Sequence, residues 1–170
     1  MTKRMGRLVA GAGVAALVAG VVGTSQPVQA GSATASFAVS AAVTANCTIS
    51  AGALAFGGYD PVSTNAASPL NGSSTLTVAC TKGTSATIAL DNGLHASGGR
   101  RMVGGTNGDF LSYALYQDNG YSTAWDSTTT KAYNAASKAA SAQTVYGRVA
   151  AGQDVSVDAY TDTVVATITF

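Results

Sequence analysis

Apolar and polar residues alternate with a period of two along much of the chain after residue 34. The longest run places apolar side chains at every second position of residues 35–47. Shorter runs follow within residues 76–80, 86–90, 111–115, 145–149 and 164–170. Because successive side chains of a strand point to opposite faces of its sheet, this pattern predicts strands that each bury one face.

Residues that favour turns separate these runs, including Asn71-Gly72, Lys82-Gly83, Asn92-Gly93 and Asn119-Gly120. Residues 130–143 are the one stretch whose composition suits a helix, but they lack an apolar stripe at helical spacing. We therefore expect a loop or a single short turn there. The expected fold is an all-β, antiparallel sandwich.

The first thirty residues, Met1–Ala30, have the pattern of a secretory signal peptide. Lys3, Arg4 and Arg7 precede an apolar stretch, and Val28-Gln29-Ala30 gives a small-x-small cleavage site before Gly31. The apolar stretch is shorter than the roughly 20 residues that span a bilayer. We expect export, no stable membrane anchor, and one domain over residues 31–170.

Charge and composition argue against several classes of function. Charged residues make up 10% of the chain, and without the signal peptide six basic residues face eight aspartates. This balance disfavours nucleic acid as a partner. A single histidine, His95, in a glycine-rich stretch expected to be a loop, offers neither a zinc ligand set nor a catalytic triad pattern. We expect no enzyme activity, no metal and no cofactor.

Two cysteines, Cys47 and Cys80, remain after residue 30. An even number in an exported protein predicts a single disulfide.

The two ends of the domain suggest how molecules associate. No turn separates residues 35–43 from the strand that holds Cys47, so a hairpin onto its own sheet is not encoded there. At the other end, the chain finishes inside an apolar strand with nothing after it to cover a neighbouring edge. A strand of one molecule would then pair with an open edge of the next, which is β-strand addition.

The remaining polar and aromatic candidates have ordinary structural interpretations. Arg148 is expected at the surface, paired with an aspartate, and Asp154, Asp158 and Asp162 are expected as solvated loop charges. A carbohydrate-stacking patch is an alternative to core and rim packing for the aromatic residues, which are Tyr113, Tyr116, Tyr121, Trp125, Tyr133 and Tyr146.

An ordered set of short segments resembles the spore coat protein U domain family, the subunit family of archaic chaperone-usher pili. The resemblance covers Ala33 to Phe170. It is carried by Phe37-Ala-Val39, Cys47-Thr-Ile49, Leu54-Ala-Phe56-Gly-Gly-Tyr59-Asp60, Val78-Ala-Cys80-Thr81, Arg101-Met102, Leu111-Ser-Tyr113-Ala-Leu115-Tyr116-Gln-Asp118, Thr144-Val-Tyr146-Gly-Arg148, and Gly152 with Tyr160-Thr-Asp162-Thr163.

The resemblance implies an incomplete immunoglobulin-like sandwich that a donor strand from a neighbouring subunit completes. It implies that Cys47 and Cys80 form the family disulfide, and that residues 31–43 are the donor segment with plug residues Ala35, Phe37, Val39, Ala41 and Val43. The strand beside the acceptor groove would carry Val164, Ala166, Ile168 and Phe170.

The function that the resemblance implies is that of a structural pilus subunit supporting adhesion or biofilm formation. Its partners would be identical or related subunits, a periplasmic chaperone and an outer-membrane usher. The protein would pass through the periplasm to the cell surface. The alternative is a self-complete secreted sandwich that binds glycans or another surface component, and that closes its sheet with its own N-terminal strand.

Overall fold

The computed structural model describes residue 23 and residues 25–170 of the chain. Most of the predicted signal peptide therefore lies outside the described residues. The chain divides into two units, residues 1–40 and residues 41–170. In the first unit, residues 25–40 carry no helix or strand, and their side chains are exposed.

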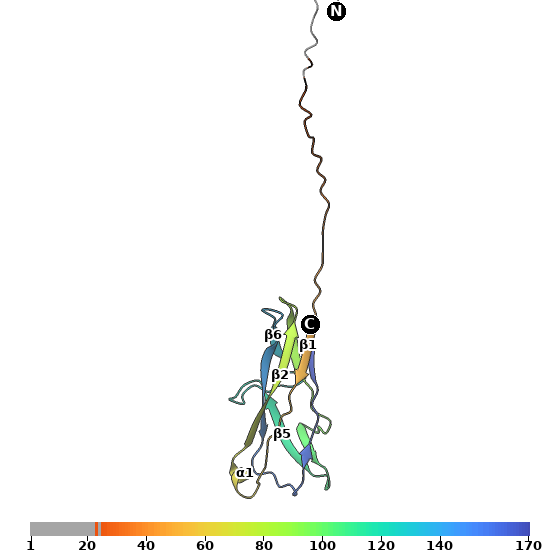
Figure 1. Ribbon diagram of the computed structural model, residues 1–170. Coiled ribbons are helices and arrows are strands. Elements are labelled where there is room, and N and C mark those ends of the chain that lie inside the picture. The colour runs from red at the N-terminus through yellow and green to blue at the C-terminus, as the bar shows by residue number, and fades with distance from the viewer. Residues whose placement is uncertain (1–22, 24) are drawn as a thin grey trace, which may run out of the picture. The chain divides into compact units, whose positions relative to one another are not determined.

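The second unit contains all the regular structure of the described residues (Figure 1). Its one helix, α1 (Thr64–Ala67), is a single turn. Among the described residues, no helix is long and apolar enough to span a membrane. The strands are β1 (Cys47–Ala51), β2 (Leu70–Cys80), β3 (Ser85–Leu90), β4 (Arg100–Gly104), β5 (Phe110–Tyr116), β6 (Lys131–Asn134), β7 (Ser141–Val149), β8 (Tyr160–Thr161) and β9 (Ala166–Thr169).

These strands form two antiparallel sheets, with the orders β1-β2-β7-β5-β4-β8 and β6-β3-β9. The alternation of the sequence places one face of each strand in a shared core. Both sheets contribute to this core, which includes Leu76, Val78, Ile88, Leu90, Leu115, Trp125, Tyr133 and Val145. The structure confirms the predicted all-β, antiparallel class.

The C-terminal segment, residues 160–169, passes from one sheet to the other. β8 pairs with β4 of the six-stranded sheet, whereas β9 pairs with β3 of the three-stranded sheet. Between them, the amides of Leu94 and Asp91 donate to the carbonyls of Thr163 and Val165, at 3.2 and 3.0 Å. The C-terminal segment therefore runs along an edge of both sheets.

Cys47 and Cys80 form a disulfide with an S–S distance of 2.02 Å. They lie directly opposite each other in the β1–β2 ladder. In the part of the chain that the structure describes, β1 is an edge strand that pairs only with β2, so the disulfide fastens this edge to the sheet.

One prediction from the sequence pattern was wrong in detail. Residues 130–143, expected as a loop, contain β6 and the start of β7, because the pairing of β6 with β3 overrides a weak local pattern. Of the run over residues 35–47, only Cys47 lies in a strand of this chain, so the pairing of residues 35–43 with another molecule stays a prediction. Alternation supplies the side chains of a strand, but the strand itself needs hydrogen bonds to a neighbour.

Candidate functional site

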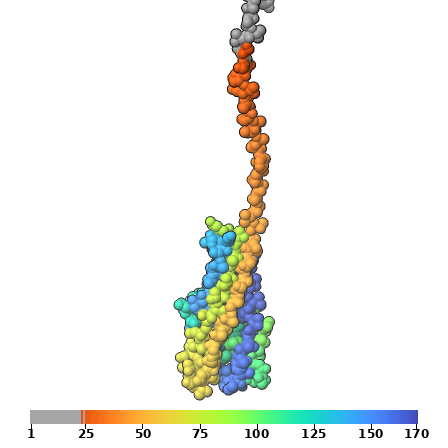
Figure 2. Space-filling view, viewed as in Figure 1, coloured from red at the N-terminus to blue at the C-terminus, as the bar shows by residue number. Residues whose placement is uncertain are grey.

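An apolar groove lies beside the C-terminal segment in the second unit. It consists of two adjoining hollows of about 390 and 600 Å³, whose linings share Leu54, Phe56, Met102 and Tyr160. Figure 2 shows the orange and yellow surface of β1 and the residues after it next to the blue surface of the C-terminal segment. The groove thus lies between a segment near the start of the second unit and a segment near its end.

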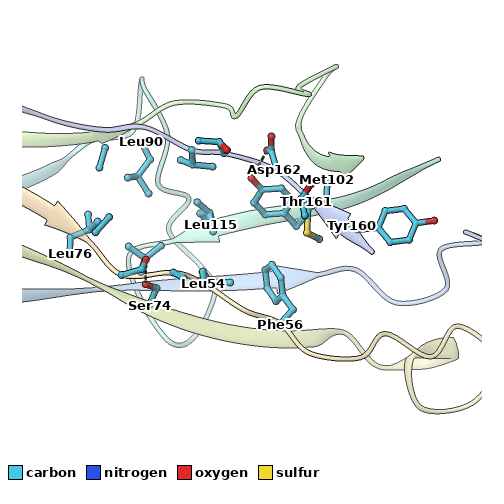
Figure 3. A pocket seen from close by; sticks show the side chains of 18 residues that line it. Leu54, Phe56, Ser74, Leu76, Leu90, Met102, Leu115, Tyr160, Thr161 and Asp162 are labelled. Atoms are coloured by element: carbon cyan, nitrogen blue, oxygen red, sulfur yellow. Dashed lines mark hydrogen bonds between the residues drawn. The ribbon is translucent and has the colours of Figure 1, made fainter. Parts of the chain in front are cut away.

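The first wall of the groove is the extended segment after β1, which carries Leu54 and Phe56 (Figure 3). Both side chains pack over Gly72 and Gly147, which are paired partners in β2 and β7. A Cβ atom on Gly147 would lie 2.7 Å from Cζ of Phe56 and 3.0 Å from Cδ1 of Leu54. The two glycines therefore make the flat surface on which this wall rests.

The second wall is the C-terminal segment, including Val164 and Ala166. Its strands β8 and β9 each have a ladder partner on one side only within residues 25–170. The opposite edge carries backbone N–H and C=O groups that a further strand can pair with. Buried core residues close the bottom of the groove, namely Leu76, Leu90, Leu115 and Val145.

Asp162 lies where the C-terminal segment passes between the sheets, and its side chain is only 2% exposed. Its carboxylate accepts hydrogen bonds from the hydroxyl of Tyr113 at 2.7 Å and from the amide of Leu94 at 3.0 Å. Burial alone would raise the pKa of Asp162, but these bonds, with those from Thr163 and His95, outweigh burial and lower the pKa. The predicted role of a solvated loop charge is therefore wrong for Asp162.

His95 belongs to the same hydrogen-bonded cluster rather than to a site of its own. Its Nδ1 lies 3.0 Å from Oδ1 of Asp162, and its carbonyl accepts a 2.6 Å hydrogen bond from Nε of Arg101. Arg101 is in β4, whereas the sequence suggested a glycine-rich loop up to this residue. Within residues 25–170, no three His, Cys, Asp or Glu side chains are grouped to hold a metal ion.

The Tyr113 hydroxyl is the other partner that holds Asp162 in the groove lining. Burial and the hydrogen bond to Asp162 raise the pKa of Tyr113, so this hydroxyl remains a donor through the neutral range. The Asp162–Tyr113 pair joins the C-terminal segment to β5 and fixes one side of the groove.

The predicted residues of the C-terminal strand divide into three groups. Val164 and Ala166 line the groove, and Ile168 packs against the core opposite Ile88. Phe170 is 53% exposed and does not line either hollow. The sequence thus located the strand but not the part of it that faces the groove.

The predicted donor residues all lie in exposed chain. Ala35, Phe37 and Val39 belong to the first unit, and Ala41 and Val43 to the start of the second. Phe37, Val39 and Val43 are 84–86% exposed. These apolar side chains alternate with polar or small residues and are not buried by the described chain, so the segment would present an apolar face if it paired as a strand.

The groove residues that sequence reasoning missed are Leu54, Phe56, Met102 and Tyr160. None of them belongs to an alternating run, because each comes from a short or unpaired segment. The signal that points to the first two is the pair of glycines in β2 and β7, at positions where a strand usually carries a side chain.

Comparison with known structures supports the fold. The fold matches one chain in a crystal structure from the archaic chaperone-usher Csu pili of Acinetobacter baumannii, with a TM-score of 0.54 and 20% identity. That structure is the CsuC–CsuE chaperone–tip adhesion subunit pre-assembly complex. The match covers 75% of this chain and 40% of that chain, so the present chain spans less than half of its structural neighbour.

Comparison of sequences identifies the family. Protein U of Myxococcus xanthus is 40% identical over 159 residues, which cover 85% of this chain and 88% of that protein. The profile of the Spore Coat Protein U domain matches residues 33–167, which include the groove, the disulfide and the exposed alternating segment. The chain therefore belongs to the Spore Coat Protein U domain family.

Proposed function

We propose that this protein is a structural subunit of a chaperone-usher type surface pilus, and that its groove receives residues 35–43 of another copy or of a related subunit. The observation that carries the proposal is the apolar groove between two sheet edges, together with a strand-like apolar segment elsewhere in the same chain. An open edge and an unburied strand face are the two halves of β-strand addition.

The chemistry of the two parts is complementary. Residues 31–46 contain no charged side chain, and the groove is lined mainly by aliphatic and aromatic groups. Burying Phe37, Val39 and Val43 would contribute about 1.5–3 kcal/mol each. Ala35 and Ala41 would contribute less, and ladder hydrogen bonds to the free edge of β8 and β9 would add to the total.

The proposed partners follow from the need to protect the groove before assembly. A periplasmic chaperone would cover it, and an outer-membrane usher would exchange that cover for the donor segment. Support comes from the family and from the structural neighbour, which belongs to a chaperone–subunit complex of archaic chaperone-usher pili. Assembly needs no cofactor, and the fibre would support adhesion or biofilm formation at the cell surface.

The test compares the chain from Gly31 to Phe170 with a truncation that lacks Gly31 to Val43, both made under oxidising conditions. Size exclusion and gel electrophoresis without boiling measure the size of the assemblies. The proposal predicts ladders or fibres for the longer chain and none for the truncation, which is expected to need a chaperone to remain soluble.

The contrary result would favour a self-complete sandwich. In that case the longer chain is a stable monomer at all concentrations, and the truncation unfolds because it has lost its own strand. The protein would then be a secreted binding domain, and glycans would be the first ligands to examine.

A further inference from the structure

A cluster of tyrosines and one arginine covers part of the six-stranded sheet on the face away from the core. Along β7, Val145, Gly147 and Val149 are buried, whereas Tyr146 and Arg148 alternate with them and point outward. The ladders place Tyr116 of β5 opposite Tyr146, and Asn71 of β2 opposite Arg148. These side chains form a partly exposed surface that is separate from the groove.

A third tyrosine, Tyr121, is placed on this surface by a constrained loop. Its φ angle is 55°, a left-handed conformation that is costly for a residue with a side chain. The loop is held by Asp118, which accepts hydrogen bonds from the amides of Ser122 and Thr123. The Tyr121 ring makes edge-to-face contacts with two other rings. Its centroid lies 5.5 Å from that of Tyr116 and 6.4 Å from that of Tyr146.

Arg148 does not make the aspartate pair that the sequence suggested. Its Nε donates to Oδ1 of Asn71 at 3.0 Å, and its guanidinium carbon lies 3.6 Å above the centre of the Tyr121 ring. Within residues 25–170, no lysine or arginine side chain lies within ion-pair distance of a carboxylate. The guanidinium is thus oriented by a neutral amide and an aromatic face, and its charge has no protein anion within ion-pair distance.

The tyrosine hydroxyls of the cluster are also free of protein partners. Those of Tyr113 and Tyr160 make hydrogen bonds within the domain. Those of Tyr116, Tyr121 and Tyr146 make none with the described residues, although their rings are half-buried. The Tyr116–Tyr121–Tyr146–Arg148 patch therefore combines fixed apolar rings, free hydroxyls and an uncompensated cation.

We propose that this patch binds an acidic carbohydrate of the uronic acid class. The outer N–H groups of Arg148 suit a carboxylate, because a guanidinium can donate two parallel hydrogen bonds to it. The tyrosine rings suit the C–H face of a sugar, and their hydroxyls suit its hydroxyl groups. The site is independent of strand exchange, so it goes beyond the proposed assembly function and can be tested apart from it.

The test measures binding of oligogalacturonic acid to the full chain by calorimetry, with its methyl-esterified form as the uncharged match. Arg148→Gln removes the cation, and Tyr121→Gly removes the ring while suiting the positive φ of the loop. Arg148→Lys keeps the charge but loses the planar fork. Lys138→Gln is the matched control, because it removes one positive charge from an exposed position outside the patch.

The expected result is that the acid binds and the ester binds far more weakly. Arg148→Gln and Tyr121→Gly should each weaken binding by about tenfold or more, with Arg148→Lys in between and Lys138→Gln unchanged. Circular dichroism checks that each variant keeps the fold of the parent.

Three results would overturn the proposal. One is that the acid does not bind. If Arg148→Gln then disrupts assembly, the patch is a contact between subunits rather than a carbohydrate site. The second is equal binding of acid and ester. The third is an equal loss in Lys138→Gln, which would indicate attraction to net charge rather than to this patch.

Discussion

At the scale of single residues, Asp162 holds in place the C-terminal segment that borders the groove. Its buried carboxylate receives hydrogen bonds from β5, through Tyr113, and from the loop after β3, through Leu94 and His95. A charged group buried in this way stabilises the fold only while its partners are present. The groove therefore depends on a polar cluster beneath an apolar surface.

Asp162→Asn is expected to lower the free energy of unfolding by about 1–3 kcal/mol, because the amide cannot accept all of these hydrogen bonds. The contribution also depends on pH. Since the folded-state pKa of Asp162 is lowered, its stabilisation is complete above the unfolded carboxyl pKa of about 4 and is lost as pH falls through the folded-state value.

The measurement is urea unfolding at several pH values between about 6 and 2, followed by the fluorescence of the single, buried Trp125. The pKa values of Asp109, Asp118, Asp126 and Asp158 are also lowered, so both proteins should lose stability in acid. The difference between wild type and variant isolates Asp162. If that difference is the same at every pH, the carboxylate does not have the role assigned to it.

Gly147 supports the opposite wall of the groove by having no side chain. In Gly147→Ala, the new Cβ would meet the ring of Phe56 at under 3 Å, so the ring must move. We expect a loss of about 1–3 kcal/mol, as for other overpacked sites, and weaker assembly. Gly147→Ala combined with Phe56→Leu, which shortens the clashing side chain, should recover part of both. Recovery of neither would show that Gly147 does not act through Phe56.

At the scale of elements, the groove exists because two edge strands lie next to each other without being paired. β1 contacts β9, but each has its ladder partner on the far side, β2 and β3 respectively. The disulfide fastens β1 to β2, and the Asp162 cluster fastens the C-terminal segment to β5. Both walls are thus held in place while the edges between them stay open.

Loss of the disulfide is expected to weaken the domain by roughly 3–4 kcal/mol, because Cys47 and Cys80 close a loop of 33 residues. Cys47→Ser with Cys80→Ser should show this loss in urea unfolding, and wild type with a reductant should match it. A double variant as stable as the oxidised wild type would mean that the β1 edge is held by packing alone.

The sequence predicted the long elements of this fold well. β2, β3, β5 and β7 each contain one of the alternating runs, β9 lies within the last one, and the turn with Lys82 and Gly83 lies between β2 and β3. It did not predict β6 or β8, because short strands gain their stability from partners distant in the chain rather than from their own pattern. β4 carries two arginines. One of them, Arg100, is buried and donates hydrogen bonds to the carbonyls of Leu90 and Asp91.

The candidate site was predicted in part for the same reason. Alternation predicted the C-terminal strand, and two of its residues, Val164 and Ala166, line the groove, whereas the donor role of residues 35–43 stays a prediction. The other wall depends on side chains resting over glycines on two different strands, which no local pattern specifies. Asp162 was misassigned because its burial arises from contacts with residues more than 40 positions away.

At the scale of the whole molecule, the proposed assembly draws on two separate parts of one chain. The groove belongs to the domain of residues 41–170, and most of the donor residues precede it. Under the proposed assembly, each chain would be incomplete alone and would complete its neighbour. The stability of a fibre would then come from a buried strand in every subunit.

Mixing two variants of the full chain tests whether the donor segment of one copy enters the groove of another. Phe37→Asp spoils the donor segment and leaves the groove intact, while Met102→Glu places a charge in the groove and leaves the donor intact. The account predicts that neither variant forms chains alone and that the mixture forms heterodimers, seen by size exclusion and native mass spectrometry. If the mixture contains only monomers, or if Phe37→Asp alone assembles like wild type, residues 35–43 are not donated to the groove of another copy.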